Sequence, residues 1–379
     1  MPSLSARTDN ELFRKFGIER NIRPGGRLEM WARCLIRLLR ELRAEATWIA
    51  GIPWRKRFRA WRRGFRSIYA EAYGLDGTND SLYVADFPYA YHSYRMNGAW
   101  NPIIGNKLVV SEVLAAHRIP HPRVVGILAK GRLMNHEAGT SDSGMDALER
   151  WTENSRAAVF RPHWSGGGQG VFFVRRSGTE WTVNGHPAGR ADVKALLDAL
   201  DRYVVTEFVE QAEYARHIFP LTTNTIRVLT IIDDDGAFVA SVAHRFGTSR
   251  SLPIDNFRQG RGLCAAVDVE TGTLGAALSL TPRFERVWHT SHPETGNPIE
   301  GVTIPGLARS LEGSLAAARC FPEAACVGWD VAITTDGFSI LEANAPPGIV
   351  VSQIHLPLLA CPRAARFFAR HGCATPSRF

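Results

Sequence analysis

The stretch GWDVAITTDGFSILEAN, from Gly328 to Asn344, decides the fold class that we expect for this chain. Two apolar runs flank the tripeptide Thr335–Gly337. This pattern is typical of a hairpin with a three-residue loop, whose glycine takes the position that needs a positive φ. In that register Thr334 faces Phe338, and the polar residues of the two strands lie beyond the apolar ones.

Two carboxylates face each other in this hairpin. The register places Asp330 opposite Glu342 and Gly328 opposite Asn344, so that Asp330, Glu342 and Asn344 share one face of the sheet. Opposed carboxylates with Cβ atoms about 5 Å apart repel each other unless a cation neutralises them. Two carboxylates and an amide suit Mg²⁺, which takes further ligands from water and phosphates. We therefore predict a magnesium site here; the alternative is a surface hairpin with solvated acids.

A glycine-rich segment lies upstream, between two expected strands. Arg161 ends the first of them, and the segment that follows is Ser165, Gly166, Gly167, Gly168, Gln169 and Gly170. Glycines let backbone N–H groups approach phosphate oxygens, and a cation at the strand end can pair with the same phosphates. The segment is not a Walker A loop, because no Gly-Lys-Ser/Thr follows. A glycine-rich hairpin is also common for conformational reasons alone.

Two further strand ends carry polar residues that suit a nucleotide or an anion. An apolar strand runs into Glu207, Phe208, Val209 and Glu210, where carboxylates can accept from an adenine amino group or ribose hydroxyls. Asn224 and Arg227 stand where a loop enters another strand, and the arginine offers a planar fork for phosphate or carboxylate. A strand that runs out into solvent and a structural arginine are the alternatives.

Strands and helices alternate from about residue 99 onward. The pattern predicts a helix over 107–118, a polar loop over 140–144, and strands over 157–161, 171–175, 204–209, 226–232, 238–245 and 327–334. This mixture indicates an α+β (α/β) fold.

The positive charge of the chain is concentrated at its N-terminus. Residues 1–70 hold 17 Lys+Arg and 6 Asp+Glu, whereas the rest holds 28 and 31. Apolar residues at helical spacing predict two amphipathic helices, over 28–49 and over 54–69, and the second combines an aromatic stripe with many arginines. Such helices suit a membrane leaflet, a polyanion or an acidic partner; the alternative is a helix packed on the main body with a solvated charged face.

Composition excludes several classes of protein. A chain of 379 residues with 45% hydrophobic side chains is long enough for two or three packed domains. It has no run of about 18 uncharged apolar residues and no signal-peptide pattern, so we expect a cytoplasmic protein. Its six cysteines form neither CxxC pairs nor Cys/His clusters. The sequence therefore predicts neither a zinc site nor a disulfide framework.

Taken in order, these segments resemble the ATP-grasp superfamily, and most closely its sugar-transfer-associated and α-L-glutamate-ligase-related branch. Asn106-Lys107, opening a helix, is similar to the first nucleotide-binding lysine segment. The resemblance covers roughly residues 95–372. Arg161 stands where the superfamily usually has lysine. Arginine keeps the positive charge of lysine and adds a planar, forked set of donors. Residues 1–90 are not explained by it and are expected to form an appended helical region.

The resemblance implies two α+β subdomains that sandwich ATP. It places a basic helical region at 1–95, an N-terminal segment with the nucleotide lysine at 96–130, a small subdomain at 131–210 and a large subdomain with the metal site at 211–379. It implies that Lys107 and Arg161 hold the α- and β-phosphates, that 207–209 read adenine and that Glu210 binds ribose. One or two Mg²⁺ ions would sit at the triad. The residues expected to be catalytic are Arg227 and Asn224, and those expected around a second substrate are His244, Arg245, Asp255, Asn256 and His292.

The activity that the resemblance implies is ATP- and Mg²⁺-dependent carboxylate–amine ligation through an acyl-phosphate, in the assembly of a glycan or a peptide-like metabolite. The expected partners are small-molecule carboxylate and amine substrates, with no specific nucleic acid. Phosphotransfer on the same fold is the alternative enzymatic interpretation. A non-enzymatic module that binds a membrane or polyanion through residues 54–66, peripheral to the inner membrane face, is the other.

Overall fold

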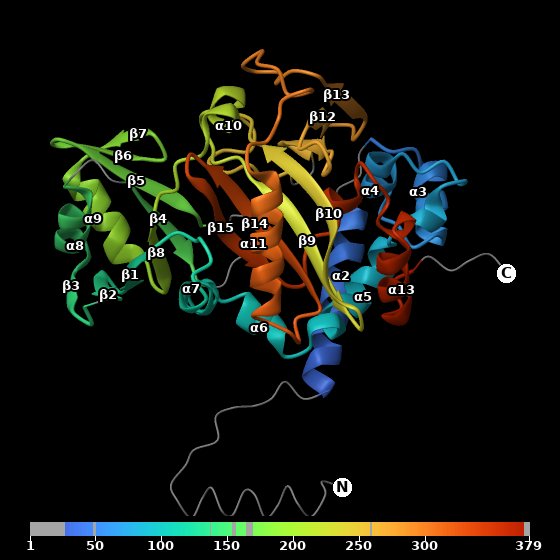
Figure 1. Ribbon diagram of the computed structural model, residues 1–379, viewed down its shortest axis with the longest axis horizontal. Coiled ribbons are helices and arrows are strands. Elements are labelled where there is room, and N and C mark those ends of the chain that lie inside the picture. The colour runs from blue at the N-terminus through green and yellow to red at the C-terminus, as the bar shows by residue number, and fades with distance from the viewer. Residues whose placement is uncertain are drawn as a thin grey trace, which may run out of the picture.

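Two antiparallel β-sheets carry the fold of this protein (Figure 1). The computed structural model describes residues 27–47, 51–136, 138–153, 157–163, 170–257 and 260–374. In this part of the chain the first sheet has eight strands in the order β3-β2-β1-β8-β4-β5-β6-β7, and the second has seven in the order β13-β12-β11-β10-β9-β14-β15. Helices pack against both sheets, which confirms the α+β class expected from the sequence.

The first sheet lies on the left of Figure 1 and is covered on one face by α8 (Gly144–Thr152) and α9 (Arg190–Ala199). Its strands are β1 Val124–Ala129, β2 Arg132–Asn135, β3 Ser141–Ser143, β4 Ala157–Pro162, β5 Phe172–Ser177, β6 Glu180–Val183, β7 His186–Ala188 and β8 Tyr203–Glu207. The sheet reaches back to Val124, so it includes residues that we had assigned to the preceding segment. The polar loop predicted over 140–144 is wrong, because it forms β3 and the start of α8.

The second sheet occupies the centre of the molecule. Its strands are β9 Ile226–Asp233, β10 Gly236–Phe246, β11 Leu263–Val267, β12 Leu274–Leu280, β13 Arg286–His289, β14 Cys326–Thr334 and β15 Gly337–Asn344. Strands β9 and β14 have apolar residues on both faces, which is why they read as nearly continuous apolar runs in the sequence. These two strands are therefore buried from both sides.

One face of the second sheet packs on α11 (Leu307–Arg319), α6 (Trp100–Ile104) and α7 (Lys107–Ala116). Trp329 is fully buried there, among Val228, Val331 and Phe321. The opposite face of β9 presents Leu229, which packs on helices from both ends of the chain. Both faces of the second sheet are thus covered by hydrophobic core, except where its polar residues face the first sheet.

The β14–β15 hairpin differs from the prediction in its turn and agrees with it at the carboxylates. Thr334 pairs with Gly337, so the loop has two residues rather than three. A bulge between Asp330 and Val331 then restores the register, because Leu341 is the extra residue of β15. Asp330 consequently faces Glu342, as predicted, although the extra residue lies in the strand and not in the turn.

The N-terminal helices belong to the main body of the protein. They are α2 Arg27–Thr47, α3 Trp54–Arg62, α4 Ser67–Tyr73 and α5 Asp86–Asn97. The single helix predicted over 54–69 is wrong, since the chain turns at Gly64, whose φ is +81°, and Phe65 is buried against the second sheet. Residues 51–97 thus supply part of the core on one face of the second sheet.

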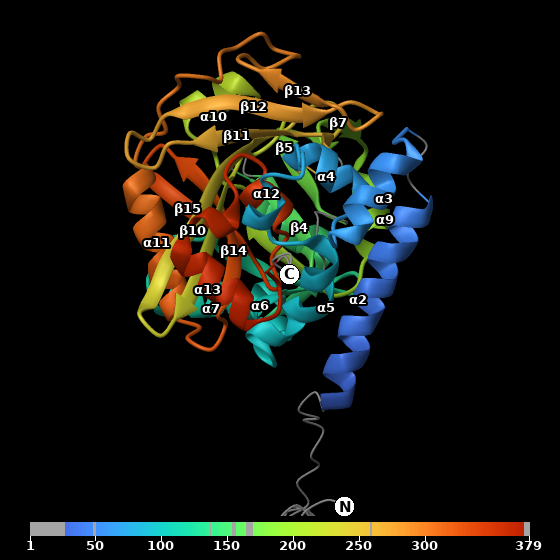
Figure 2. The ribbon, with the colours of Figure 1, turned by 90° about the vertical axis from the view of Figure 1, so that its right-hand side faces the viewer.

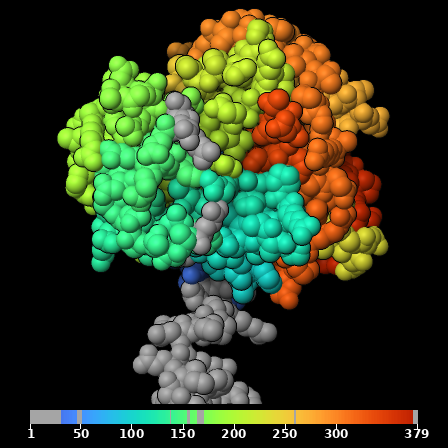
Figure 3. All heavy atoms as spheres, turned by 60° about the vertical axis from the view of Figure 1, so that its left-hand side comes forward, coloured from blue at the N-terminus to red at the C-terminus, as the bar shows by residue number. Residues whose placement is uncertain are grey.

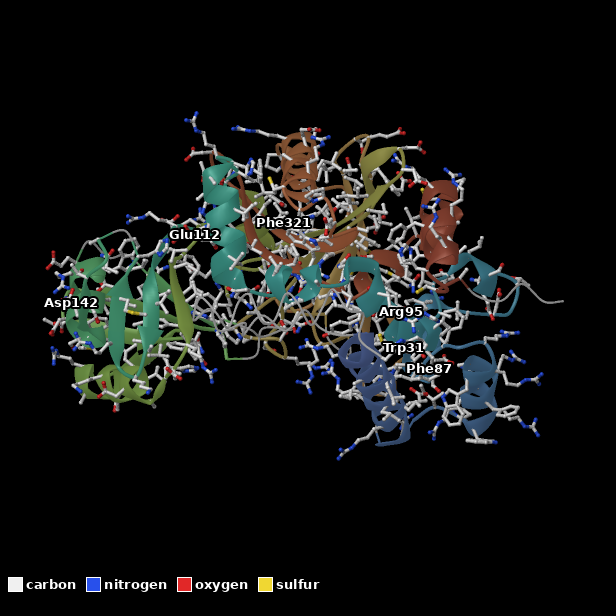
Figure 4. All side chains as sticks on the ribbon, turned by 90° about the horizontal axis from the view of Figure 1, so that it is seen from below. Trp31, Phe87, Arg95, Glu112, Asp142 and Phe321 are labelled. Atoms are coloured by element: carbon white, nitrogen blue, oxygen red, sulfur yellow. The ribbon has the colours of Figure 1, made fainter. Side chains whose placement is uncertain are left out.

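Helix α2 runs along one edge of the molecule beside α5 (Figure 2). Trp31 contacts Tyr91 with ring centroids 5.6 Å apart, and the Arg95 guanidinium lies 3.6 Å from the Trp31 ring centroid (Figure 4). The remaining helices are α10 Glu213–Ile218, α12 Val350–Gln353 and α13 Pro362–Arg370. In the described part of the chain, no helix has the length and apolar character needed to cross a membrane.

Asp86 gives the N-terminal helices a pH-dependent stability. Burial raises the pKa of Asp86 to about 7, against the opposing effect of a hydrogen bond from the Arg66 N–H. A raised carboxyl pKa favours the folded state below the unfolded pKa of about 4, and this contribution is lost as the pH rises through about 7.

We therefore expect Asp86→Asn to raise the free energy of unfolding at about pH 8, by at most about 4 kcal/mol, and to change it little at about pH 4. Urea unfolding followed by circular dichroism measures both values. Asp235→Asn in the exposed β9–β10 turn is the matched control and should change the free energy of unfolding little, because the side chain is not buried on folding. An equal effect of Asp86→Asn at both pH values would contradict the assignment.

Candidate active site

A cleft of about 1090 Å³ lies between the two sheets. Figure 3 shows the lobe of the first sheet, in green, projecting beside the rest of the molecule. The first sheet and the chain that follows it contribute Val159, Arg161, Val171, Phe173, Thr206, Glu207, Phe208 and Val209, and the second contributes Arg227, Arg245, Asp330, Leu341, Glu342 and Asn344. Residues predicted from separate motifs thus meet at one place.

A buried ion pair joins neighbouring strands on the cleft face of the second sheet. Asp330 on β14 lies directly opposite Arg227 on β9. Arg227 Nε donates to Asp330 Oδ1 at 2.6 Å and Nη2 donates to Oδ2 at 3.2 Å, which is a bidentate contact. Both side chains are less than a tenth exposed. The arginine fork is therefore held rigidly by the strand pairing and by the carboxylate.

Arg245 on β10 extends this pair into a network. Its Nη2 lies 3.2 Å from Asp330 Oδ2 and 3.3 Å from Asp255 Oδ1. Asp255 Oδ2 in turn accepts from the N–H and the hydroxyl of Thr225, at 2.7 and 2.5 Å. Because Thr225 directly precedes β9, this network also fixes the loop that enters the strand.

The other half of the site reaches Glu342 and the first sheet. Lys107 Nζ, at the first position of α7, lies 3.1 Å from Glu342 Oε1. Arg161 Nη1 donates to the backbone carbonyl of Leu341, the bulged residue of β15. This bond links the two sheets directly, and the bulge leaves the Leu341 carbonyl available because that residue has no partner in the β14 register.

Burial and charge oppose each other in this cluster. Burial alone would raise the pKa of Asp330, but the Arg227 and Arg245 guanidinium groups outweigh it and the pKa is lowered. Burial raises the pKa of Asp255 despite the lowering effect of Arg245. Burial also lowers the pKa of Arg161, which Glu342 only partly offsets. Buried charges of this kind are stable only when they are paired.

Positive charge exceeds negative charge at the site. Lys107, Arg161, Arg227 and Arg245 stand against Asp255, Asp330 and Glu342, four cations against three carboxylates. Among the described residues, the Nε atoms of Arg161 and of Arg245 are buried and have no hydrogen-bond partner. Buried unpaired donors are rare and call for a partner. The unpaired guanidinium donors and the net positive charge of the cluster both fit an anion such as a polyphosphate in the cleft.

The predicted metal ligands also retain free acceptor capacity. Asp330 Oδ1 accepts a single hydrogen bond from Arg227, whereas a carboxylate oxygen offers about two lone pairs. Lys107 occupies one oxygen of Glu342, and Asn344 Nδ2 donates to Asp330 Oδ2 at 3.3 Å, which leaves the Asn344 amide oxygen as an acceptor. This oxygen set fits a hard divalent ion. Since the cluster is already cationic, the ion would bind together with phosphates rather than before them.

Apolar residues from both sheets line the cleft beside the charged cluster. They include Val159, Phe173, Phe208, Val209 and Leu341. Phe173 and Phe208 pack edge to face, with ring centroids 5.6 Å apart. A narrow apolar wall next to a cationic one matches a ligand with a flat ring at one end and phosphates at the other.

Some predicted nucleotide contacts lie at the margin of the cleft or beyond the described residues. Ser165, Gly166, Gly167, Gly168 and Gln169 lie outside the described residues, and Gly170 follows them with a φ of +74°. The Glu207 carboxylate accepts from the Arg123 N–H at 2.9 Å. Glu210 is mostly exposed and lies 3.4 Å from Arg175, so its contact with ribose stays a prediction.

Three predicted site residues are instead structural. Asn224 is buried, and its amide donates to Gln211, Ala215 and Phe219 while its oxygen accepts from Gly247 N, so the catalytic role predicted for it is wrong. His244 points to the other face of the sheet, where burial lowers its pKa to about 3 and Tyr214 contacts its Nε2.

His292 is also buried away from the cleft, where its Nε2 contacts the Gly247 carbonyl oxygen and its ring stacks on Phe219. The predicted substrate contacts of His244 and His292 are therefore wrong. Arg245, Asp255 and Asn256, predicted with them, do line the cleft.

Helix α2 forms one wall of the cleft that was not predicted from the sequence. Arg33, Arg37 and Arg40 of α2 line it, opposite the residues of the two sheets. Their spacing of three and four residues places them on one side of a helix, and that signal was present in the sequence. It could not be connected to the site, because nothing local showed that α2 packs beside the second sheet.

Two antiparallel sheets that face each other across a cleft, with a cationic cluster on one side and opposed carboxylates on a terminal hairpin, define an ATP-grasp protein. A family model described as sugar-transfer associated ATP-grasp matches residues 89–363. The chain therefore belongs to the sugar-transfer associated ATP-grasp family. The match begins within α5, so α2, α3 and α4 lie outside it.

Solved structures with a related arrangement are remote. An N5-carboxyaminoimidazole ribonucleotide synthetase in complex with ADP is 14% identical over 67% of this chain and 48% of its own, with a TM-score of 0.38. D-alanine–D-alanine ligase from Bacillus anthracis is 14% identical over 80% and 76%, with a TM-score of 0.39. Biotin carboxylase from Campylobacter jejuni is 13% identical over 73% and 48%, with a TM-score of 0.40.

This chain thus spans about half the length of the synthetase and of the carboxylase. No curated protein sequence matches the chain.

The excess of buried cations predicts that a polyphosphate binds without a metal. We expect sodium tripolyphosphate to raise the melting temperature by about 2–4 °C at saturating concentration, because it satisfies the unpaired guanidinium donors. Magnesium chloride alone should not raise it. Differential scanning fluorimetry at matched ionic strength measures both shifts.

Arg161→Gln should lose most of the tripolyphosphate shift. Arg319→Gln on the exposed side of α11, where Arg319 pairs with Glu312, is the matched control and should keep it. A stabilisation by magnesium chloride equal to that by tripolyphosphate would contradict the charge balance that we derive.

Proposed function

We propose that this protein is an ATP- and Mg²⁺-dependent carboxylate–amine ligase. The observation that supports it most is the cluster of Arg161, Arg227 and Arg245 with Asp330 and Glu342, which lines a cleft large enough for a nucleotide and a second substrate. Lys107 pairs with Glu342 behind this lining. Pockets for a single small ligand usually have about 300–1,000 Å³. Family membership supports the use of ATP. That the two other substrates are a carboxylate and an amine is the more specific part of the proposal.

The nucleotide would lie along the seam between the sheets. The apolar wall near Phe173 and Val209 would receive the adenine, and Lys107 and Arg161 the α- and β-phosphates. Asp330, Glu342 and Asn344 would hold Mg²⁺, which supplies charge neutralisation for the β- and γ-phosphates when it is bound. As phosphate arrives, Arg161 would exchange the Leu341 carbonyl for a stronger, charge-assisted contact.

In the first half-reaction a substrate carboxylate oxygen attacks the γ-phosphorus. The bond from this phosphorus to the β–γ bridging oxygen breaks, ADP leaves, and an acyl-phosphate forms. Arg227 uses Nε and Nη2 on Asp330, so its remaining N–H groups can contact the transferring phosphoryl group. Because Asp330 already holds this guanidinium, little reorganisation is required as charge develops.

In the second half-reaction an amine attacks the acyl carbon. The carbon–oxygen bond to phosphate breaks, inorganic phosphate leaves, and the amine loses one proton as the amide forms. Arg245 and Asn256, which line the cleft, would contact the acyl group or the phosphate. An amine that arrives neutral needs no strong base, and proximity supplies much of the rate.

The alternative on this site is phosphotransfer without ligation. It would use the same nucleotide contacts, and ADP would then form without an amine. Product analysis separates the two reactions, because the ligase releases one inorganic phosphate for each amide bond formed.

We expect Glu342→Gln to lower ADP formation at least about 10²-fold, since it removes a metal ligand and the partner of Lys107. The measurement is coupled ADP release with Mg-ATP and a panel of amino acids and sugar acids as carboxylates. Glu312→Gln on the exposed side of α11 is the matched control and should retain wild-type activity. The ligase proposal is falsified if wild-type turnover is unaffected by the amine.

A further inference from the structure

Helix α2 exposes a continuous apolar strip to solvent. Leu35 is 50% exposed, Ile36 63%, Leu39 54% and Leu42 44%. At about 100° per residue, these side chains fall within an arc of about 120° on the helix. Cys34, on the opposite side of α2, is fully buried. Leu35, Leu39 and Leu42 therefore face away from the body of the protein, and Ile36, at one margin of the strip, lies at the edge of the cleft.

Helix α3 adds aromatic rings to this strip. Trp54 is 62% exposed and Phe58 49%, and their ring centroids lie 6.1 Å apart. Trp54 also contacts Trp61, whose indole N–H donates to Glu45 near the end of α2 at 2.8 Å. The rings thus adjoin the C-terminal end of the strip. We call Leu35, Ile36, Leu39, Leu42, Trp54 and Phe58 the α2–α3 surface.

Arginines surround the α2–α3 surface. Residues 27–66 hold 12 Lys+Arg against 3 Asp+Glu, a net charge of +9. Two of those acids are engaged internally, since Glu41 pairs with Arg66 at 2.7 Å and Glu45 accepts from Trp61. The exposed cations of the two helices are Arg33, Arg40, Arg43, Arg55, Lys56, Arg59 and Arg62.

An anionic lipid surface matches both properties of these helices. Apolar side chains with aromatic rings, bordered by arginines, are the composition of helices that lie in the interfacial plane of a bilayer. Each cation near an anionic leaflet adds electrostatic attraction to it. A second copy of this chain would bring two net charges of the same sign together, and a nucleic acid would leave the leucines exposed to water.

We propose that the α2–α3 surface docks this protein on an anionic membrane leaflet. The helices lie on the leaflet with their leucines and aromatic rings at the boundary between headgroups and acyl chains. Arg33, Ile36 and Arg40 also line the cleft, so docking brings the mouth of the cleft to the headgroups. If the cleft holds the proposed ligase site, its second substrate would then reach it from the membrane surface. Only this consequence rests on the proposed function; the docking itself does not.

Vesicle co-sedimentation of the full chain, without nucleotide, tests the proposal. The wild type should sediment with vesicles of phosphatidylcholine and phosphatidylglycerol and stay in the supernatant with phosphatidylcholine alone. Leu35→Ser/Leu39→Ser should lower partitioning at least about tenfold, because each buried leucine contributes more than about 1.4 kcal/mol. Trp54→Ser/Phe58→Ser is the second variant, in case the first does not fold.

Leu221→Ser/Val269→Ser is the matched control, since both residues are exposed but lie far from α2 in the sequence. It should partition like the wild type. Equal partitioning of wild type and Leu35→Ser/Leu39→Ser, or no binding of the wild type, would overturn the proposal. So would a wild-type dimer that the same double variant converts to a monomer in sedimentation velocity, because a second copy would then cover the surface.

These outcomes are independent of the ligase reaction. Loss of vesicle binding with normal ADP formation affects only this inference, and normal vesicle binding without ATP turnover affects only the proposed function.

Discussion

The buried contact between Arg227 and Asp330 is the interaction on which the site depends. It joins adjacent strands of the second sheet, and Arg245 approaches the same carboxylate from the next strand along. To break such a pair by removing one partner typically costs about 3–5 kcal/mol, because the other charge stays buried. The sheet therefore presents its guanidinium groups in fixed positions before any ligand arrives. That rigidity suits a reaction in which positioned charge stabilises a transferring phosphoryl group.

The sequence predicted where the opposed carboxylates lie because their arrangement is local. Asp330, Glu342 and Asn344 lie on one hairpin, and the bulge at Leu341 gives them the same register as the three-residue turn that was predicted. Asn224 and His244 were misassigned for the opposite reason. Each stands beside a true cleft residue, Thr225 or Arg245, and one position along a strand or loop decides whether a polar side chain faces ligand or core. The sequence shows the polar residue but not the partners that satisfy it.

The N-terminal helices show a second limit of prediction. Their amphipathic pattern was clear, yet α3 ends at Arg62, because the chain must turn to bury Phe65 against the second sheet. The pattern did not show which side of α2 faces the protein body. Trp31 and Cys34 hold α2 at its edge, while one flank of the helix lines the cleft and the leucines remain exposed. Such an arrangement depends on contacts between residues far apart in the chain. The spacing of apolar residues along one segment gives no information about these contacts.

The bulge at Leu341 has a consequence for how relatives of this protein should be compared. The extra residue of the hairpin lies in the strand here, but a three-residue turn with regular strands would place Glu342 opposite Asp330 equally well. A change of one residue in length between the two acids would move Glu342 to the far face, unless a second irregularity compensated. Evolution should therefore hold the number of residues between the two acids constant, while the composition of the turn drifts. Where gaps fall inside this hairpin in an alignment, they should occur as an insertion matched by a deletion.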